Sequence, residues 1–271
     1  MSQALKSSTI NPFLFMKIKQ LGIVSAGVAL ATLATAGAAQ AALVVVPPDL
    51  AVGAQYLLVF VTEGKWEATS TDIDDYNNLV TSQVLAGPGT TDTALYQALK
   101  AAGFDPNAIT WKAIGSTASV DARDNTGTNP TLSTGVPIYL IDGNRVANNN
   151  ADLWDGSIQT AINRTPEDWQ LNNEPVWTGT NNNGTAENGR LGGGSLGQVR
   201  YGLANSITTE WITMADSSRF GVSRLYGISS VLTVPTPAVS VPEPSSLLGC
   251  ITLGGLMLGG AVRLTGGGSD T

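Results

Sequence analysis

The stretch Tyr56-Leu-Leu-Val-Phe-Val61 decides the fold of this chain. It is an unbroken run of aromatic, leucine and β-branched residues near the start of the body. A short continuous apolar run of this kind predicts a buried β-strand.

Two helices are predicted after the strand. Apolar residues spaced three and four apart predict a helix over 72–84, with Thr71 and Asp74 as a capping box. A second helix is predicted over 94–102, and it ends at Gly103.

Further strands are predicted at 109–114, at 137–141 before an Asp142-Gly143 hairpin turn, and at 222–234. Turn residues dominate 142–221, but four tryptophans in that region indicate ordered loops. The pattern predicts an α+β domain in which the first and last strands can pair.

Composition excludes several kinds of site. The chain of 271 residues contains no histidine and one cysteine, so it can form no histidine-based triad, Cys/His zinc site or intrachain disulfide. Its net charge is −7, and residues 42–240 carry ten basic against nineteen acidic side chains. We therefore expect no nucleic-acid partner.

The N-terminal region has the pattern of a secretory signal peptide. Residues 16–41 combine two lysines, an apolar run and a small-residue cleavage site at Ala39, Ala41 and Ala42. We expect signal peptidase to act there, with 1–15 a mis-called start. A membrane anchor is the alternative reading.

The C-terminal region carries a second targeting pattern. A proline-rich linker over 236–246 contains Pro242, Glu243 and Pro244, an apolar segment over 247–263 is expected to be a transmembrane sorting helix ending at Arg263, and 264–271 form a tail. This pattern resembles the PEP-CTERM sorting signal. The resemblance implies an exosortase-type membrane protease as partner, although the lone Arg263 departs from the family's arginine cluster.

The body resembles the endostatin-like, C-type-lectin-like domain of bacterial surface proteins. Five segments over about 55–235 carry the resemblance: VFVTEGKW (59–66), TWKAIGSTASVDARDN (110–125), GVPIYLIDGNRVANNNADLWDGSI (135–158), PVWTGTNNNGT (175–185) and SRLYG (223–227). It implies a C-type-lectin-like α+β fold with two helices, a small antiparallel sheet and a long loop region, after an extended segment at 42–54. The family's cysteines are missing, with Gly227 after Tyr226, and the zinc site of the eukaryotic relatives cannot be carried over.

Two kinds of ligand contact are predicted. Oxygen-bearing side chains that could hold calcium or another ligand gather at Asp142, Asn144, Asn148, Asn149, Asp152 and Asp155, with Glu174 further along. The alternative is that these residues stabilise their own turns. Trp154 and Trp177 could stack on sugars, or else fill the core.

Catalytic motifs are weak. Gly193-Gly-Ser-Leu-Gly197 matches a nucleophile elbow, but no histidine is present to act as base. The acid pairs Asp121/Asp124 and Glu167/Asp168 could be glycosidase carboxylates or ordinary turn residues.

We therefore expect a non-catalytic exported protein. It would be anchored briefly in the inner membrane and then reach the cell surface or extracellular matrix, where its lectin-like body associates with polysaccharide or matrix proteins. No cofactor is expected unless calcium binds. The alternatives are an exported carbohydrate-active enzyme that uses paired carboxylates and a structural matrix protein without a ligand.

Overall fold

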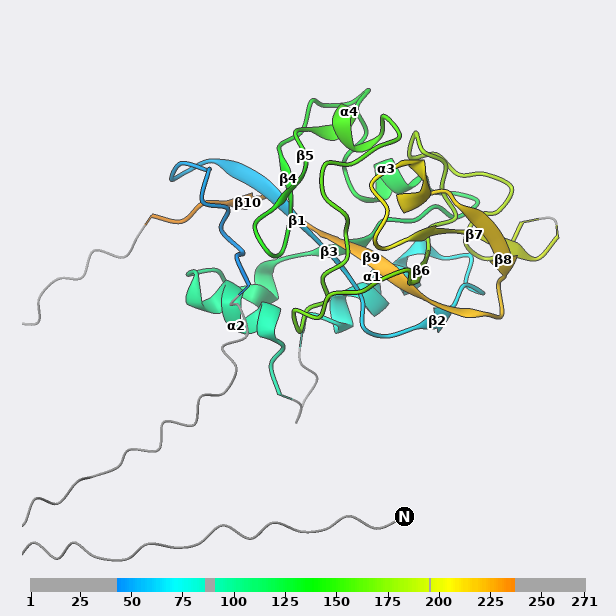
Figure 1. The fold of residues 1–271 in the computed structure, drawn as a ribbon, viewed down its shortest axis with the longest axis horizontal. Coiled ribbons are helices and arrows are strands. Elements are labelled where there is room, and N and C mark those ends of the chain that lie inside the picture. The colour runs from blue at the N-terminus through cyan, green and yellow to red at the C-terminus, as the bar shows by residue number, and fades with distance from the viewer. Residues whose placement is uncertain (1–42, 86–90, 195, 237–271) are drawn as a thin grey trace, which may run out of the picture. The chain divides into compact units, whose positions relative to one another are not determined.

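The fold is built around the apolar run at 56–61 (Figure 1). The structure, a computed structural model, describes residues 43–85, 91–194 and 196–236. Strand β1, Gln55–Val61, is buried on both faces, and its alternate side chains join two hydrophobic clusters: Tyr56, Leu58 and Phe60 in the first, Leu57, Val59 and Val61 in the second. Burial on both faces explains why the run is continuously apolar rather than alternating.

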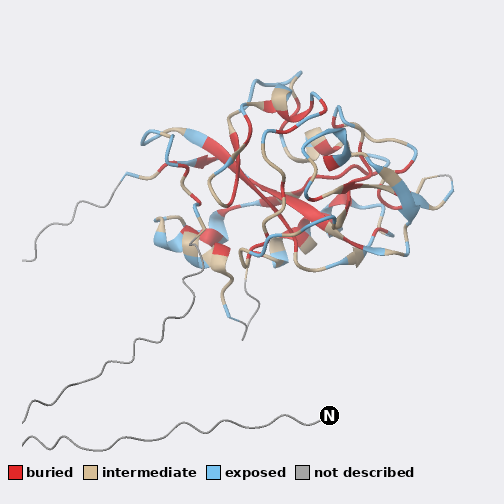
Figure 2. Ribbon diagram, in the orientation of Figure 1, coloured by how far each residue is buried: buried red, intermediate tan, exposed pale blue. Residues whose placement is uncertain are grey.

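The described residues form ten strands in one mixed sheet, whose main order is β5-β4-β1-β9-β6-β7-β8. Figure 2 shows the buried strands at its centre. The remaining strands are β2 (Trp66–Glu67), β3 (Trp111–Ala113), β4 (Ile138–Leu140), β5 (Arg145–Ala147), β6 (Pro175–Trp177), β7 (Gln198–Leu203), β8 (Ala215–Ser218), β9 (Val222–Ser229) and β10 (Leu232–Thr233).

The first and last strands of the body pair, as expected. β1 lies antiparallel to β9, with Phe60 opposite Gly227, and antiparallel to β10. On its other edge β1 runs parallel to β4, and β6 runs parallel to β9. The segment at 222–234, predicted as one strand, is divided into β9 and β10.

The helices are short. They are α1 (Ile73–Ser82), α2 (Ala94–Ala101), α3 (Ala122–Asn125) and α4 (Asn150–Leu153), with 3₁₀ turns at η1 (Pro106–Ala108) and η2 (Thr209–Trp211). α1 contacts β3 and β9. Its N-cap is Asp72, whose carboxylate accepts from the N–H of Asp74, so the predicted capping box of Thr71 and Asp74 is wrong.

The predicted fold class is also wrong. In place of a small antiparallel sheet in a C-type-lectin-like α+β domain, the described chain is mostly β, with ten strands in a mixed sheet and few short helices. The main reason is the region 142–221, for which the turn-rich sequence predicts loops. It contributes β5, β6, β7 and β8, most of them three or four residues long.

The targeting segments lie outside the described residues. This holds for 1–41 and Ala42, and for the linker from 237, the apolar segment 247–263 and the tail. Among the residues described, no helix is both long enough and apolar enough to cross a bilayer.

Candidate functional site

The oxygen-rich cluster predicted to bind calcium lies between the β4–β5 turn and α4. The Asp142 carboxylate accepts from the N–H of Asn144 at 3.1 Å, and the side chain of Asn149 caps α4 by accepting from the N–H of Asp152 at 3.0 Å. These are the local bonds that stabilise turns and helix starts.

The rest of the cluster is bonded in the same way. The Asp152 carboxylate accepts from the N–H and amide of Asn148 and from Gln159, and that of Asp155 accepts from the N–H and hydroxyl of Ser157. The described residues contain no group of three or more acidic or cysteine side chains able to hold a metal ion. The cluster therefore has a local structural use that needs no ion.

Glu174 lies elsewhere, at the start of β6. Its carboxylate is 2.7 Å from Lys65 Nζ and 3.3 Å from Arg224 Nε. The hydrogen bond from Lys65, with help from Arg224, holds its pKa below the ordinary value. Arg224 also donates to the carbonyls of Thr62 and Glu63, so Glu174 ties β6 to the end of β1.

The two tryptophans predicted to stack on sugars are buried. Trp154 is 6% exposed and packs against Trp211 at a ring distance of 5.9 Å, and Trp177 is 2% exposed and donates to the carbonyl of Trp66. Neither ring presents a face to solvent.

Trp169 is instead the exposed tryptophan. Its side chain is 62% exposed, and the neighbouring Gln170, Asn172 and Asn173 are exposed as well. Sequence reasoning missed it because Asp and Gln flank Trp169 while Leu and Asp flank Trp154, and such neighbours do not separate a surface ring from a core ring.

The loop that carries this ring, residues 163–171, is held by a compact set of bonds. We call it the Trp169 loop. The N–H of Thr165 donates to the carbonyl of Trp169 at 3.0 Å, and the hydroxyl of Thr165 accepts from the N–H of Trp169 at 3.2 Å. That hydroxyl donates in turn to Glu63 at 2.8 Å, and the N–H of Leu171 donates to the carbonyl of Asn163. Because Thr165 is fully buried, Trp169 is fixed to the core beside β1.

The backbone next to the ring is strained. Asp168 has φ 64°, a left-handed conformation that costs a non-glycine residue about 1 kcal/mol or more. Arg164 stabilises it, since its Nη1 lies 3.4 Å from the Asp168 carboxylate and 3.3 Å from its carbonyl. Arg164 Nε also lies 3.5 Å from Asp142. Burial raises the pKa of Asp168, and the nearby charge of Asp142 adds to this while Arg164 opposes it.

The other predicted acid pairs are engaged with the protein itself. Asp121 accepts from the N–H of Ala186, Asp124 accepts from the amide of Asn129, and Glu167 accepts from the N–H of Ala94 at the start of α2. Each of these carboxylates accepts a hydrogen bond from another part of the protein.

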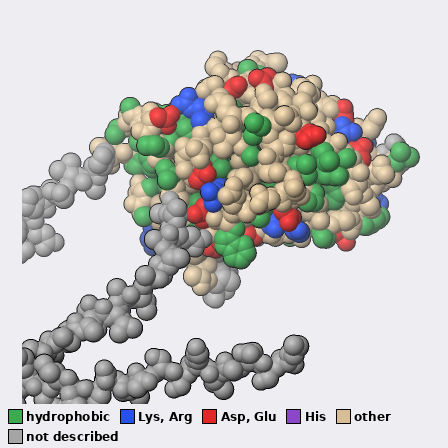
Figure 3. Space-filling view, in the orientation of Figure 1, with side chains coloured by type: hydrophobic (Ala, Val, Ile, Leu, Met, Phe, Trp, Pro, Cys, Tyr) green, Lys and Arg blue, Asp and Glu red, His purple; other side chains and the backbone are tan. Residues whose placement is uncertain are grey.

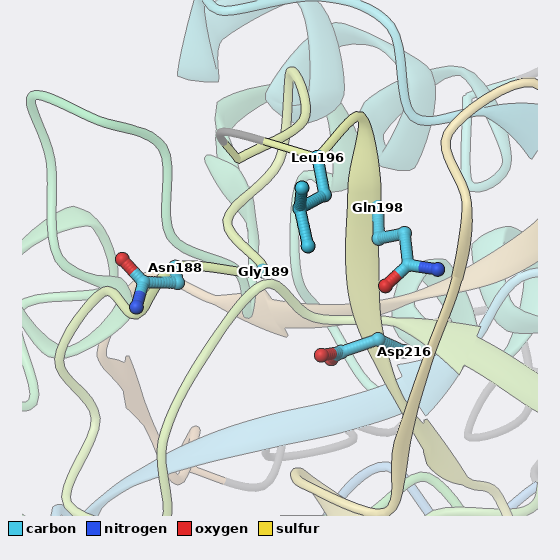
Figure 4. Close-up of a pocket in the computed structure, with 5 residues that line it drawn as sticks. All are labelled: Asn188, Gly189, Leu196, Gln198 and Asp216. Carbon is cyan, nitrogen blue, oxygen red and sulfur yellow. The ribbon is translucent and has the colours of Figure 1, made fainter.

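A small open pocket lies at the N-terminal end of β7 (Figure 4). Its volume is about 250 Å³, which includes space open to solvent. Its lining is Asn188, Gly189, Leu196, Gln198 and Asp216. Asp216 is held by Arg200, with Nε 2.7 Å from the carboxylate. The segment 193–197, which matches the nucleophile-elbow motif, borders this pocket, but its Ser195 lies outside the described residues.

On the face shown in Figure 3, acidic and basic side chains are interspersed among polar and apolar ones. Among the described features, the Trp169 loop best combines an exposed aromatic ring, a well-bonded backbone and neighbouring amide groups.

Neither the known family models nor the curated proteins compared with this chain match its sequence.

Proposed function

We propose that this chain is an exported, non-catalytic surface or matrix protein whose body binds extracellular polysaccharide through Trp169. The observation that carries the binding proposal is a 62% exposed tryptophan held rigidly between buried Thr165 and the strained Asp168. An indole ring offers an apolar face to the C–H groups of a sugar. The amides of Gln170, Asn172 and Asn173 can hydrogen-bond to its hydroxyls.

Rigid support favours binding in energetic terms. The backbone that carries the ring is already held by hydrogen bonds, so binding orders less of the chain than it would on a mobile loop. An exposed, well-anchored aromatic side chain is also a poor choice for stability alone, since burying it would remove apolar area from water.

Binding is tested with purified residues 42–240 and the producer's own exopolysaccharide, by co-sedimentation with calcium and with chelator. We expect Trp169→Ala to weaken binding at least about tenfold, or about 1.4 kcal/mol. The matched control is Leu132→Ala, which removes an apolar side chain from another loop at a residue that is even more exposed, at 79%. Equal binding by both variants and the native body would refute the proposal.

The proposed delivery follows from the sequence motifs. Signal peptidase would cleave near Ala41, and an exosortase-type protease would act at Pro242, Glu243 and Pro244 after the segment up to Arg263 had held the chain in the inner membrane. We expect Glu243→Ala to leave a longer precursor in the membrane fraction on immunoblots. Release of a normally processed chain would contradict this delivery route.

A further inference from the structure

The loop between β6 and β7 contains two asparagines that are each followed by glycine. These pairs are Asn183-Gly184 and Asn188-Gly189. In both pairs the asparagine is exposed and the glycine is buried. The two pairs therefore have the same covalent chemistry and similar accessibility, and they differ in their hydrogen bonds and in the glycine backbone, since Gly184 has φ 82° and Gly189 has no positive φ.

The first pair is locked on both reacting sides. The side-chain oxygen of Asn183 accepts from the N–H of Thr185 at 3.1 Å and from its hydroxyl at 2.7 Å. The N–H of Gly184 donates to the carbonyl of Asn181 at 3.0 Å. Movement of the Gly184 nitrogen toward the Asn183 side chain must break these bonds.

The second pair lacks such hydrogen bonds within the part of the chain that the structure describes. No described group hydrogen-bonds to the side chain of Asn188 or to the N–H of Gly189. The two residues occupy the centre of a turn closed by Arg190 N–H and the carbonyl of Glu187, at 3.2 Å. Figure 4 shows the Asn188 amide pointing away from Gln198 and Asp216.

Packing explains why a glycine follows Asn188. A Cβ on Gly189 would lie 2.8 Å from Asp216 Oδ1 and 3.0 Å from the backbone nitrogen of Arg200. Both neighbours are fixed, since Arg200 holds the Asp216 carboxylate and its own N–H donates to the carbonyl of Gly189. The close approach of β7 therefore requires a glycine here, and the glycine leaves the Asn188 side chain next to an unhindered peptide nitrogen.

We propose that Asn188 is a site of spontaneous deamidation in the folded protein. The Gly189 nitrogen loses its proton to water or hydroxide and attacks Cγ of Asn188. The N–Cγ bond forms, Nδ2 takes up a proton from water as the Cγ–Nδ2 bond breaks, and ammonia leaves, which gives a five-membered succinimide. Water then opens the ring to aspartate or isoaspartate, with no oxidant or reductant involved.

The modification changes the charge of one surface region. It adds one negative charge beside Glu187, whose carboxylate is already paired with Arg200. The modified protein is therefore a more acidic form, which ion exchange separates from the native one.

The test uses the full chain, aged in mildly alkaline buffer at physiological temperature, beside a sample in guanidinium chloride. Peptide mapping by mass spectrometry follows both asparagines. In the folded chain we expect Asn188 to convert at least about tenfold faster than Asn183, because a single lost hydrogen bond of about 1.4 kcal/mol in the barrier suffices for that factor. In denaturant the two rates should become similar.

Two variants sharpen the result. Asn188→Gln should remove most of the acidic form and leave only the slower conversion at Asn183, since the longer glutamine side chain closes a six-membered ring less readily. Thr185→Ala should speed conversion at Asn183 by removing one of its two bonds. Conversion at Asn183 that equals or exceeds that at Asn188 in the folded chain would overturn the proposal, and so would an intact Asn188 in folded protein whose denatured sample converts.

Discussion

The carboxylate of Glu174 lies 2.7 Å from the ammonium of Lys65. Together with Arg224 on β9, this contact makes Glu174 the electrostatic link between the start of β6 and the end of β1. A glutamate neutralised by two cations of its own chain contributes to stability, and its charge is not free to hold an ion.

The first prediction concerns the pH dependence of this link. The folded pKa of Glu174 is lowered, so its contribution is complete above the unfolded value of about 4.3 and is lost as pH falls through the folded value. Glu174→Gln should lower the free energy of unfolding by about 1 kcal/mol at neutral pH, and the difference should shrink toward zero as pH falls through the lowered folded pKa.

Urea unfolding at several pH values measures this difference. The control is Glu210→Gln, which changes an exposed glutamate in η2 and should have little effect at any pH. A Glu174 effect that stays constant down to acidic pH would show that the carboxylate charge is not what stabilises the link.

A second prediction concerns a buried hydroxyl in the second cluster. The ring of Tyr226 packs 5.9 Å from that of Trp211, but its OH is buried without a hydrogen-bond partner among the described residues. Burial raises its pKa, which keeps the group neutral. Tyr226→Phe keeps the ring and removes the desolvated oxygen, so it should raise the free energy of unfolding by about 1 kcal/mol.

Tyr139→Phe is the matched comparison, because the hydroxyl of Tyr139 donates to Asp49 and accepts from Arg145. This variant should lose about 1 kcal/mol in the same urea titration. If both phenylalanine variants lost stability equally, Tyr226 OH would have a partner, such as a buried water.

Much of the fold near β1 could be predicted from the sequence. The positions of β1, α1, α2 and the β4–β5 hairpin follow from an unbroken apolar run, helical spacing and an Asp-Gly turn. These are local signals. They predict the elements correctly because each element contains enough residues to show its periodicity in the sequence.

The mixed sheet could not be predicted in this way. Strand β6 has three residues, Pro175–Trp177, which is too few to show alternation, and its parallel pairing with β9 depends on residues about fifty positions away. Which tryptophan is exposed to solvent could not be predicted for a related reason. Burial of Trp154 and exposure of Trp169 depend on which tertiary surface covers each ring.

A third prediction tests the packing around Gly227. A Cβ there would lie 2.6 Å from Phe60 Cζ and 2.6 Å from Val80 Cγ1. Gly227→Ala should therefore lower the free energy of unfolding by about 1–3 kcal/mol, through displacement of α1 from β9. Val80→Ala makes room at the same spot, so the double variant should be less destabilised than the sum of the two single ones. Additive losses would show that the methyl group does not meet Val80.

A fourth prediction separates backbone strain from ion pairing at Asp168. Asp168→Ala loses the pairing with Arg164 and keeps the left-handed backbone, whereas Asp168→Gly loses the same pairing but adopts φ 64° freely. The alanine variant should be less stable than the glycine variant by about 1 kcal/mol, measured by thermal or urea unfolding. Equal stabilities would mean that the loop relaxes out of the strained conformation when the carboxylate is removed.

The fifth prediction concerns solvent access to the proposed sugar platform. All six tryptophans lie in described residues, and Trp169 is the exposed one, since Trp66 is half-buried and the other four are buried. Acrylamide should therefore quench mainly Trp169, and Trp169→Phe should remove most of the readily quenched fluorescence without changing the unfolding midpoint. Saturating polysaccharide should protect the native body from acrylamide and leave the quenching of Trp169→Phe unchanged. Binding without protection would place the polysaccharide on another surface, because a sugar stacked on the ring must exclude the quencher from its face.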